Sequence, residues 1–170
     1  MQVRLAGDDD LVDVADVTEA AYRPFTLGPA DPYVAKLRDT AARARDAELW
    51  VATLDVAATE GQGDGTGEVV GSVTVCPPGS PWREIARDGE GEFRMLAVAP
   101  GVQGQGVGSA LVEKVLERSR EAGDEAVVLS SLPSMHTAHR LYARHGFVRV
   151  PERDWAPLPA VPLVVFRRAL

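Results

Sequence analysis

The sequence has little cysteine and no excess of positive charge. Its one cysteine, Cys76, cannot form an internal disulfide, and its place in an alternating apolar run predicts a buried thiol. No convincing histidine partner lies near it, which disfavours a nucleophilic role. Against 25 Asp and Glu there are only 18 Lys and Arg, so the formal net charge is −7. This balance argues against the phosphate backbone of nucleic acids as the main ligand.

Long hydrophobic runs are also missing. The longest apolar-leaning run, residues 126–135, is far shorter than the roughly 20 residues that a membrane helix needs, and the N-terminus has no apolar signal region. The chain has 170 residues, of which 45% are hydrophobic, enough to bury a core. We therefore expect a single domain over residues 1–170, located in the cytoplasm.

Hydrophobic periodicity predicts strands that alternate with helices. Helices are expected over residues 11–22, 31–47, 108–122 and 135–145. Strands are expected over residues 1–5, 48–56, 68–76, 92–98, 126–131, 147–150 and 163–168. The glycine-rich segment 58–67 is expected to be a long mobile hairpin loop. The connection 151–162 contains four prolines and is expected to be ordered by stiffness more than by hydrogen bonding.

The stretch VQGQGVGS, residues 102–109, places a glycine-rich turn before a helix. Such a turn gathers unpaired main-chain N–H groups at the positive end of the helix dipole, which favours anions and phosphates above all. The spacing excludes a Walker loop, because Ser109 and Ala110 follow Gly108 and no lysine comes before Lys114. It also departs from the Rossmann G-x-G-x-x-G pattern. A purely structural turn stays open on the glycines alone.

Two motifs resemble those of one family. Residues 103–108, QGQGVG, match the signature Q/R-x-x-G-x-G/A, and they follow a strand ending LAVAP. Residues 138–147, AHRLYARHGF, match the segment A-x-x-L-Y-x-x-x-G-F. In order and separation the two resemble the GCN5-related N-acetyltransferase (GNAT) superfamily. The tail, PERDW at residues 151–155 followed by a final strand, resembles that of bacterial and especially actinobacterial members.

This resemblance implies an α+β fold with a central, mostly antiparallel sheet of six to seven strands and about four helices. The sheet is expected to splay between its fourth and fifth strands, residues 92–98 and 126–131, with acetyl-CoA as co-substrate wedged into the gap. Main-chain groups of Leu96, Ala97 and Val98 are expected to bond the pantetheine amides as a neighbouring strand does. The pyrophosphate is expected at Gln103, Gly104, Gln105, Gly106, Val107, Gly108 and Ser109.

The resemblance also implies catalytic residues. Tyr142 aligns with the family's tyrosine, a phenol that can act as general acid toward the CoA sulfur. The alternative is core packing with Leu141 and Phe147. The main-chain N–H of Val98 is the expected oxyanion donor.

Glu92 is the candidate general base, at a position that carries a carboxylate in several members of the family. Strand alternation places it on the face of Leu96 and Val98. The alternative is a strand-edge charge paired with Arg94, with deprotonation through water.

Histidines and serines give weaker signals. His136 and His139 lie three residues apart on one expected helix, but no third ligand is in register and no H-E-x-x-H pattern occurs. Surface or capping roles are favoured for them and for His145, and no metal is expected. Ser130 and Ser131 end a strand and could bond a ligand or form a turn.

The resulting hypothesis is an N-acetyltransferase that passes the acetyl group directly to a primary amine, without a covalent enzyme intermediate. The acceptor is open, a small-molecule amine or a peptide N-terminus, and the acidic balance favours a cationic one. Neither nucleic acid nor membrane is an expected partner, and a homodimer is an open alternative. A non-catalytic acyl-CoA-binding module and a longer-chain acyltransferase, with space near Met95 and Leu132, are the competing hypotheses.

Overall fold

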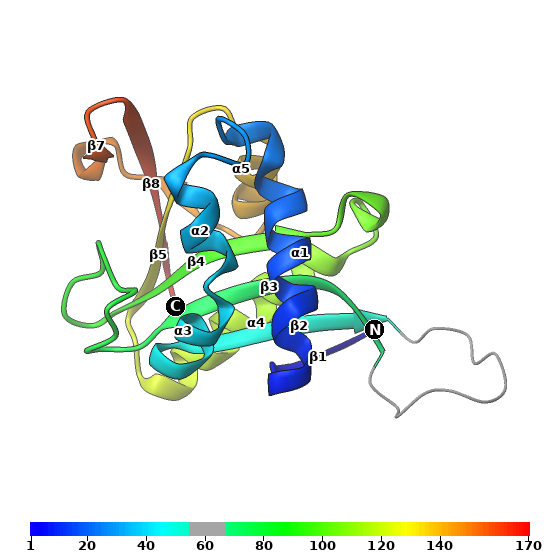
Figure 1. Ribbon diagram of the computed structural model, residues 1–170. Helices are drawn as coiled ribbons and strands as arrows, with labels where there is room; N and C mark the ends of the chain where they lie inside the picture. Colours follow the sequence, from blue (N-terminus) through cyan, green and yellow to red (C-terminus); the bar gives the residue numbers. More distant parts are fainter. Residues whose placement is uncertain (55–66) are drawn as a thin grey trace, which may run out of the picture. The chain divides into compact units, whose positions relative to one another are not determined.

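The computed structural model describes residues 1–54 and 67–170 (Figure 1). Contacts divide the chain into two compact units, the first made of Met1–Thr74 and Met95–Leu111, the second of Val75–Arg94 and Val112–Leu170. The expected hairpin loop, residues 58–67, lies almost wholly outside the described residues. The expectation of one domain stays a prediction.

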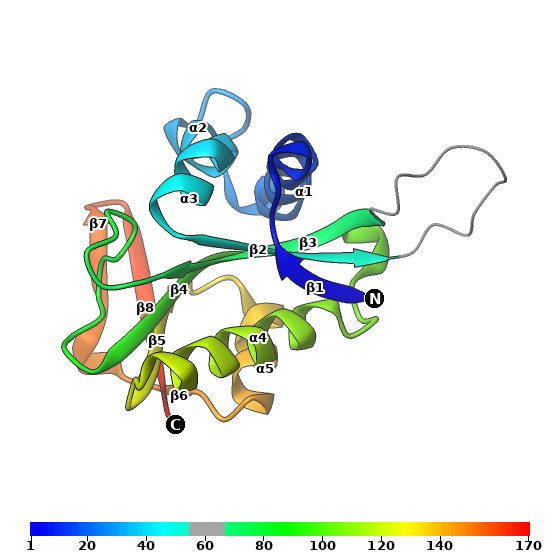
Figure 2. The same ribbon diagram turned by 90° about the horizontal axis from the view of Figure 1, so that it is seen from below.

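The first unit is built on strands β1 to β4, which follow one another in the sheet. β1 (Gln2–Leu5) pairs antiparallel with β2 (Glu48–Leu54). β3 (Glu68–Cys76) and β4 (Glu90–Val98) each continue into the second unit. α1 (Leu11–Tyr22), α2 (Pro32–Arg38) and α3 (Thr40–Asp46) lie on one face of these strands (Figure 2). The apolar stripe of α1 packs there, in a core that includes Val14, Leu49, Val51 and Val69.

The prediction of a single helix over residues 31–47 is wrong, because the helix is interrupted at Asp39. Its ψ of 61° departs from helical geometry, and its carboxylate accepts a hydrogen bond from the Ala42 N–H at 3.2 Å. An aspartate that caps a new helix competes with the helix before it. Two short helices result, and Arg43 on the second is fully buried, donating to Thr74 Oγ1 at 2.9 Å and to the Leu37 carbonyl at 3.0 Å.

The second unit contains the first half of β4, β5 (Ala126–Ser131), β6 (Val148–Arg149) and β8 (Val161–Ala169), in the order β4-β5-β8-β6. β5 runs parallel to β4, with Glu90 to Glu92 opposite Ala126 to Val128, and antiparallel to β8 along its whole length. The parallel register thus covers the first three residues of each strand. The sheet is mixed, as an α+β fold of this kind requires.

The second unit also holds most of α4 (Val107–Ala122), and α5 (His136–Arg144). No helix among the described residues is long and apolar enough to cross a membrane.

A further strand was missed in the proline-rich connection 151–162. β7 (Trp155–Leu158) pairs antiparallel with β8, with Trp155 opposite Leu163 and Leu158 opposite Val161. The expectation that stiffness replaces hydrogen bonding here is therefore wrong. Proline is tolerated on such a strand because an edge strand leaves alternate N–H groups without a ladder partner.

The start of α4 packs closely on β3 and β4 in the first unit. A Cβ added at Gly71 would lie 2.8 Å from Val107 Cγ1, 2.9 Å from the Ala97 carbonyl oxygen and 3.1 Å from Leu111 Cδ1. The absence of a side chain at Gly71 therefore lets the helix and its entrance approach the strands.

We predict that Gly71→Ala lowers the free energy of unfolding by about 1–3 kcal/mol, because the methyl group would overpack this contact. Urea unfolding measures the change. Gly101→Ala is the matched control, since no atom lies within 4 Å of a Cβ built there. Equal stability of the two variants would contradict the close approach.

Candidate functional site

The glycine turn lies in the first unit and has the geometry of a helix entrance. A 3-10 turn over Pro100–Val102 leads into it, and Gly104 and Gly106 have φ of 82° and 88°. The first bond of the following helix runs from the Ala110 N–H to the Gly106 carbonyl, at 3.0 Å. The N–H groups before it, those of residues 107–109, are the ones that a helix leaves without an intrahelical acceptor.

Open space lies beside the two glycines. A Cβ built at Gly104 or Gly106 would have no atom within 4 Å, so the requirement there is for positive φ and not for room. Main-chain donors at the positive end of a helix, next to glycines with open space beside them, fit an anionic group such as a phosphate. The Gln103 side chain donates to the Val98 carbonyl at 3.5 Å, which is the long limit for a hydrogen bond.

The strand that precedes the turn is distorted at Met95. With φ of 51°, Met95 is the only non-glycine residue with positive φ in the described part of the chain. This conformation is strained for a side chain and interrupts extended geometry. The alternation that placed Glu92 on the face of Leu96 and Val98 therefore cannot be counted across it.

Tyr142 lies in the second unit, on α5, and is 6% exposed. Its ring packs against Phe93, Phe147 and Phe166, with centroids 5.7–6.1 Å apart. Burial raises the pKa of its phenol, so the hydroxyl stays protonated at neutral pH. Core packing, one of the two roles expected from the sequence, is therefore a property of this side chain, and the role of general acid stays a prediction.

A polar pair, His139 with Ser131, lies one turn before Tyr142 on α5. His139 Nε2 is 3.2 Å from Ser131 Oγ at the end of β5, and its ring packs on Phe166 at 4.9 Å. Burial lowers the pKa of His139, which favours the neutral imidazole. A usable signal was present in the sequence, since His139 precedes Tyr142 by three residues and so shares its helix face. Among the described residues, no three His, Cys, Asp or Glu side chains are grouped to hold a metal.

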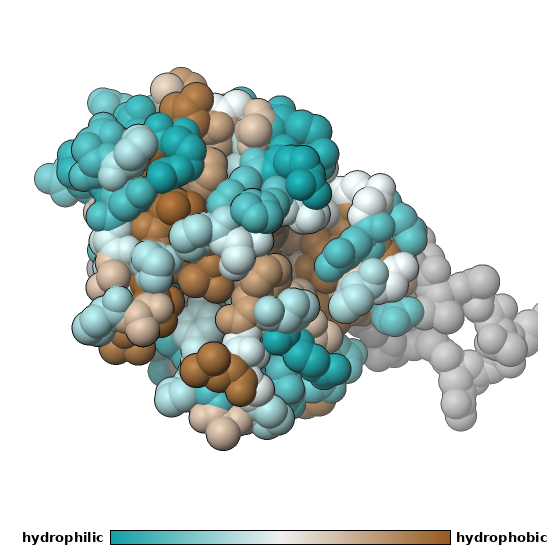
Figure 3. Space-filling view, turned by 90° about the horizontal axis from the view of Figure 1, so that it is seen from above, coloured by the Kyte–Doolittle hydropathy of each residue, from teal (hydrophilic) through white to brown (hydrophobic). Residues whose placement is uncertain are grey.

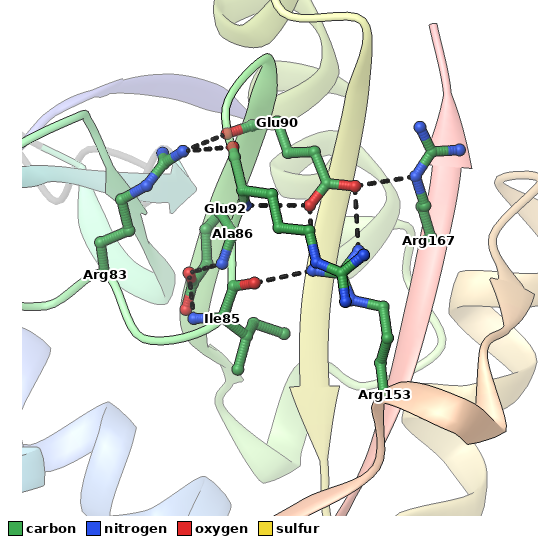
Figure 4. Close-up of polar contacts among 8 residues, drawn as sticks. Arg83, Ile85, Ala86, Glu90, Glu92, Arg153 and Arg167 are labelled. Carbon is green, nitrogen blue, oxygen red and sulfur yellow. Dashed lines mark hydrogen bonds and ion pairs between the residues drawn. The ribbon is translucent and has the colours of Figure 1, made fainter.

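Glu92 is buried against the segment that joins β3 to β4, residues 77–89 (Figure 4). Its Oε2 accepts from the N–H groups of Glu84, Ile85 and Ala86 at 2.9–3.0 Å, and its Oε1 from that of Glu84 at 3.1 Å. Three successive main-chain donors thus converge on one carboxylate. The expected partner Arg94 pairs instead with Glu84, at 2.8 Å.

Glu90, two residues earlier on the same face of β4, forms the centre of an ion cluster (Figure 4). Each of its two oxygens accepts a hydrogen bond from the Arg153 guanidinium at 2.9 Å, and one of them also accepts a hydrogen bond from Arg167 at 2.9 Å. Burial by itself would raise the pKa of Glu90, but the hydrogen bonds from Arg153, the Arg87 N–H and Arg167 lower it to about 2. Arg153 also donates to the Ile85 carbonyl at 2.7 Å.

The candidate residues thus fall in separate units. Those expected to bind the cofactor, residues 96–98 and 103–109, belong to the first unit, and Tyr142 and Glu92 belong to the second. The pairing of Ser131 with His139 and the cluster around Glu90 were not predicted from the sequence. On the face drawn in Figure 3, hydrophobic residues lie in separate patches among hydrophilic residues.

Comparison with known proteins gives one family. Residues 14–147 match the family described as acetyltransferase (GNAT) family. A mycothiol acetyltransferase from Cellulomonas flavigena is 30% identical over 132 residues, which are 72% of this chain and 36% of that protein. The chain spans from 24% to 56% of the length of the curated relatives that it matches.

Solved structures agree on the fold. An acetyltransferase of the GNAT family from Staphylococcus aureus superposes with a TM-score of 0.73 at 13% identity, covering 99% of this chain and 98% of that one. A GNAT family acetyltransferase from Brucella melitensis, solved in complex with acetyl-CoA, is 26% identical with a TM-score of 0.55, over 86% of this chain and 82% of that one.

The low pKa of Glu90 predicts a specific acid sensitivity. Its folded-state pKa of about 2 lies below the ordinary value of 4.5, so its contribution to stability is complete above pH 4.5 and is lost as the pH falls toward 2. From the pKa difference, this contribution is on the order of 3 kcal/mol. Urea unfolding at pH 7 and pH 3 should show Glu90→Gln to be less stable at pH 7 and less sensitive to acid. An unchanged acid sensitivity would contradict the assignment, and Glu121→Gln, at an exposed position of α4, is the control.

Proposed function

Because the chain belongs to the acetyltransferase (GNAT) family, we propose that it is an N-acetyltransferase that uses acetyl-CoA and acetylates a primary amine directly. One observation carries the proposal beyond family membership. The turn at residues 102–109 presents main-chain N–H groups at a helix entrance, with positive φ at Gly104 and Gly106 and open space beside both. Those are properties that a pyrophosphate requires of its binding site.

We assign the cofactor to residues of the first unit. The pyrophosphate is bound by main-chain donors of residues 104 and 106–109, while the Gln105 N–H donates to the Val102 carbonyl at 3.3 Å within the turn. Gln103 adds hydrogen-bonding capacity without charge. The pantetheine amides bond the main chain of residues 96–98 in the manner of an added strand. In support, the register of β4 with β5 covers Glu90 to Glu92 and does not extend to the end of β4.

The chemistry needs three groups. The amine nitrogen, as the free base, attacks the thioester carbon, the C–S bond breaks, an amide forms, and the nitrogen's surplus proton leaves to a base or to water. The Val98 N–H stabilises the oxyanion, and Tyr142 gives its proton to the departing sulfur and regains one from solvent. The raised pKa of Tyr142 supports this role because it keeps the phenol protonated. No metal is required. The carboxylate expected from the sequence as the base, that of Glu92, already accepts the N–H groups of residues 84–86.

The acceptor is proposed only as a class, a primary amine on a small molecule or a peptide N-terminus. The net charge of −7 supports a cationic acceptor. The competing hypotheses are a non-catalytic acyl-CoA-binding module of the same fold and an enzyme for longer acyl chains. A homodimer and a cytoplasmic location stay predictions.

A thiol-release assay tests the proposal. The protein is incubated with acetyl-CoA and a panel of primary amines, including polyamines, amino sugars and peptides, while free CoA thiol is followed. We expect release with at least one amine, with the acetylated product confirmed by mass spectrometry. Tight CoA binding without release for any amine would instead support the binding module, and faster release from a longer acyl-CoA would support the long-chain enzyme.

Tyr142→Phe tests the general acid. The phenyl ring preserves the packing with Phe93, Phe147 and Phe166 but removes the proton, so kcat should fall about 100-fold, the lower end of what general acid catalysis contributes. Acetyl-CoA affinity, measured by calorimetry, should stay within about threefold because the assigned contacts are elsewhere. Tyr33→Phe is the control. An unchanged kcat would remove Tyr142 as the acid.

A further inference from the structure

Three side chains of β4 hold the segment 77–89 from one face of the strand. Glu90, Glu92 and Arg94 alternate along β4, and all three bond the main chain or the side chains of this segment. Figure 4 shows Glu90 and Glu92. Arg94 donates to the Trp82 carbonyl at 3.1 Å and pairs with Glu84. An irregular segment of this length is thereby fixed through its backbone and does not rely on its own secondary structure.

Glu92 is the centre of this attachment. Its side chain is 1% exposed and receives the successive N–H groups of residues 84–86. Successive N–H groups that point to one spot form an anion-binding concavity, and here the anion is supplied by the chain itself. A carboxylate so placed is satisfied by main-chain donors and is closed to an approaching amine.

The opposite face of β4, at Phe93, contacts Tyr142, the proposed general acid. Phe93 lies between Glu92 and Arg94 in the strand, so its side chain is on the other face, and its ring centroid is 6.0 Å from that of Tyr142. Therefore α5 and the segment 77–89 lie on opposite faces of this part of β4. If Tyr142 protonates the sulfur from one face, the amine approaches from the other. The segment 77–89 is then a wall of the acceptor site.

We propose that Glu92 is a positioning residue: it holds residues 84–86 as a rigid wall for the acceptor amine, and the proton of the amine leaves to solvent water. The inference rests on the proposed function and deepens it. Arg153 contributes to the same attachment from the connection 151–162, since it joins Glu90 to the Ile85 carbonyl. The attacking amine enters as the free base, and its surplus proton passes to water once the C–N bond has formed.

The charged surroundings of Glu92 are shared among several elements. β3 contributes Cys76, whose thiol pKa is raised to about 12 by burial and then by the charge of Glu92. The other charged groups near Glu92 are Arg83, Glu84, Glu90 and Arg94, together with Arg153 and Arg167, which bond Glu90. With proton transfer to water, the acid limb of kcat/KM follows the basicity of the acceptor and not a group of this cluster.

Hydrogen exchange and kinetics of Glu92→Gln test the proposal together. An amide side chain turns an NH2 group toward donors, so exchange at the amides of residues 84–86 should accelerate at least tenfold. KM for the amine should rise at least tenfold, with kcat reduced less than tenfold and acetyl-CoA affinity unchanged. The acid limb should persist and should shift between a weakly basic amine, glycinamide, and a strongly basic one, butylamine, or between the two most different amines that the panel yields.

Two further variants keep the test decisive. Arg153→Lys, which leaves Glu92 in place, should give the same pattern in weaker form, and it replaces Glu92→Gln if that variant does not fold. Asp88→Asn is the matched control, because it also turns a carboxylate into an amide at an exposed position of the segment and keeps the carboxylate of Glu92 with its main-chain donors. It should leave exchange and KM unchanged.

Two results would overturn the proposal. One is the loss of the acid limb together with a 100-fold or larger fall in kcat, while KM and exchange stay unchanged, which assigns Glu92 as the base. The other is unchanged exchange and unchanged KM in both Glu92→Gln and Arg153→Lys. Failure of the proposed function is distinct, because wild-type protein would then neither bind acetyl-CoA nor acetylate any amine.

Discussion

Every main-chain N–H group in an irregular segment needs a hydrogen-bond acceptor, and two segments of this chain, one in each unit, meet that need in opposite ways. In the segment 77–89 the hydrogen-bond acceptor belongs to the chain itself, because the Glu92 carboxylate accepts hydrogen bonds from the N–H groups of residues 84–86. In the turn at residues 102–109, the donors of the helix entrance precede the first helical bond at Ala110. The first arrangement fixes an irregular segment to β4, and the second leaves main-chain donors at the entrance of a helix.

Local signals predicted most of the fold. The ranges of α1, β3 and β5 follow hydrophobic period and turn residues, and the GNAT family is confirmed by the match over residues 14–147. The prediction of one helix over residues 31–47 was wrong because Asp39 can either continue a helix or cap a new one. Here its carboxylate caps α3, although the apolar pattern continues through it. β7 was missed because its partner β8 supplies a pairing that the proline-rich sequence does not indicate.

The sequence predicted those features of the candidate residues that depend on neighbouring residues, and not those that depend on distant partners. Positive φ at Gly104 and Gly106 follows from glycine spacing and can be expected from the sequence. The partners of Glu92 and Glu90 cannot, because they are main-chain groups of an irregular segment and an arginine 63 residues away. Strand alternation also fails at Met95, where one strained residue interrupts the count.

The most direct measurement is a comparison of two acetyl thioesters by nuclear magnetic resonance, with the glycine amides labelled. Acetyl-CoA should shift the amide signals of Gly104, Gly106 and Gly108, because its pyrophosphate accepts bonds from this turn. S-acetylpantetheine, which lacks the pyrophosphate, should leave those three signals in place. Equal shifts with both compounds, or no shift at the turn while acetyl-CoA binds elsewhere, would contradict the assignment of this turn as the cofactor's anion site.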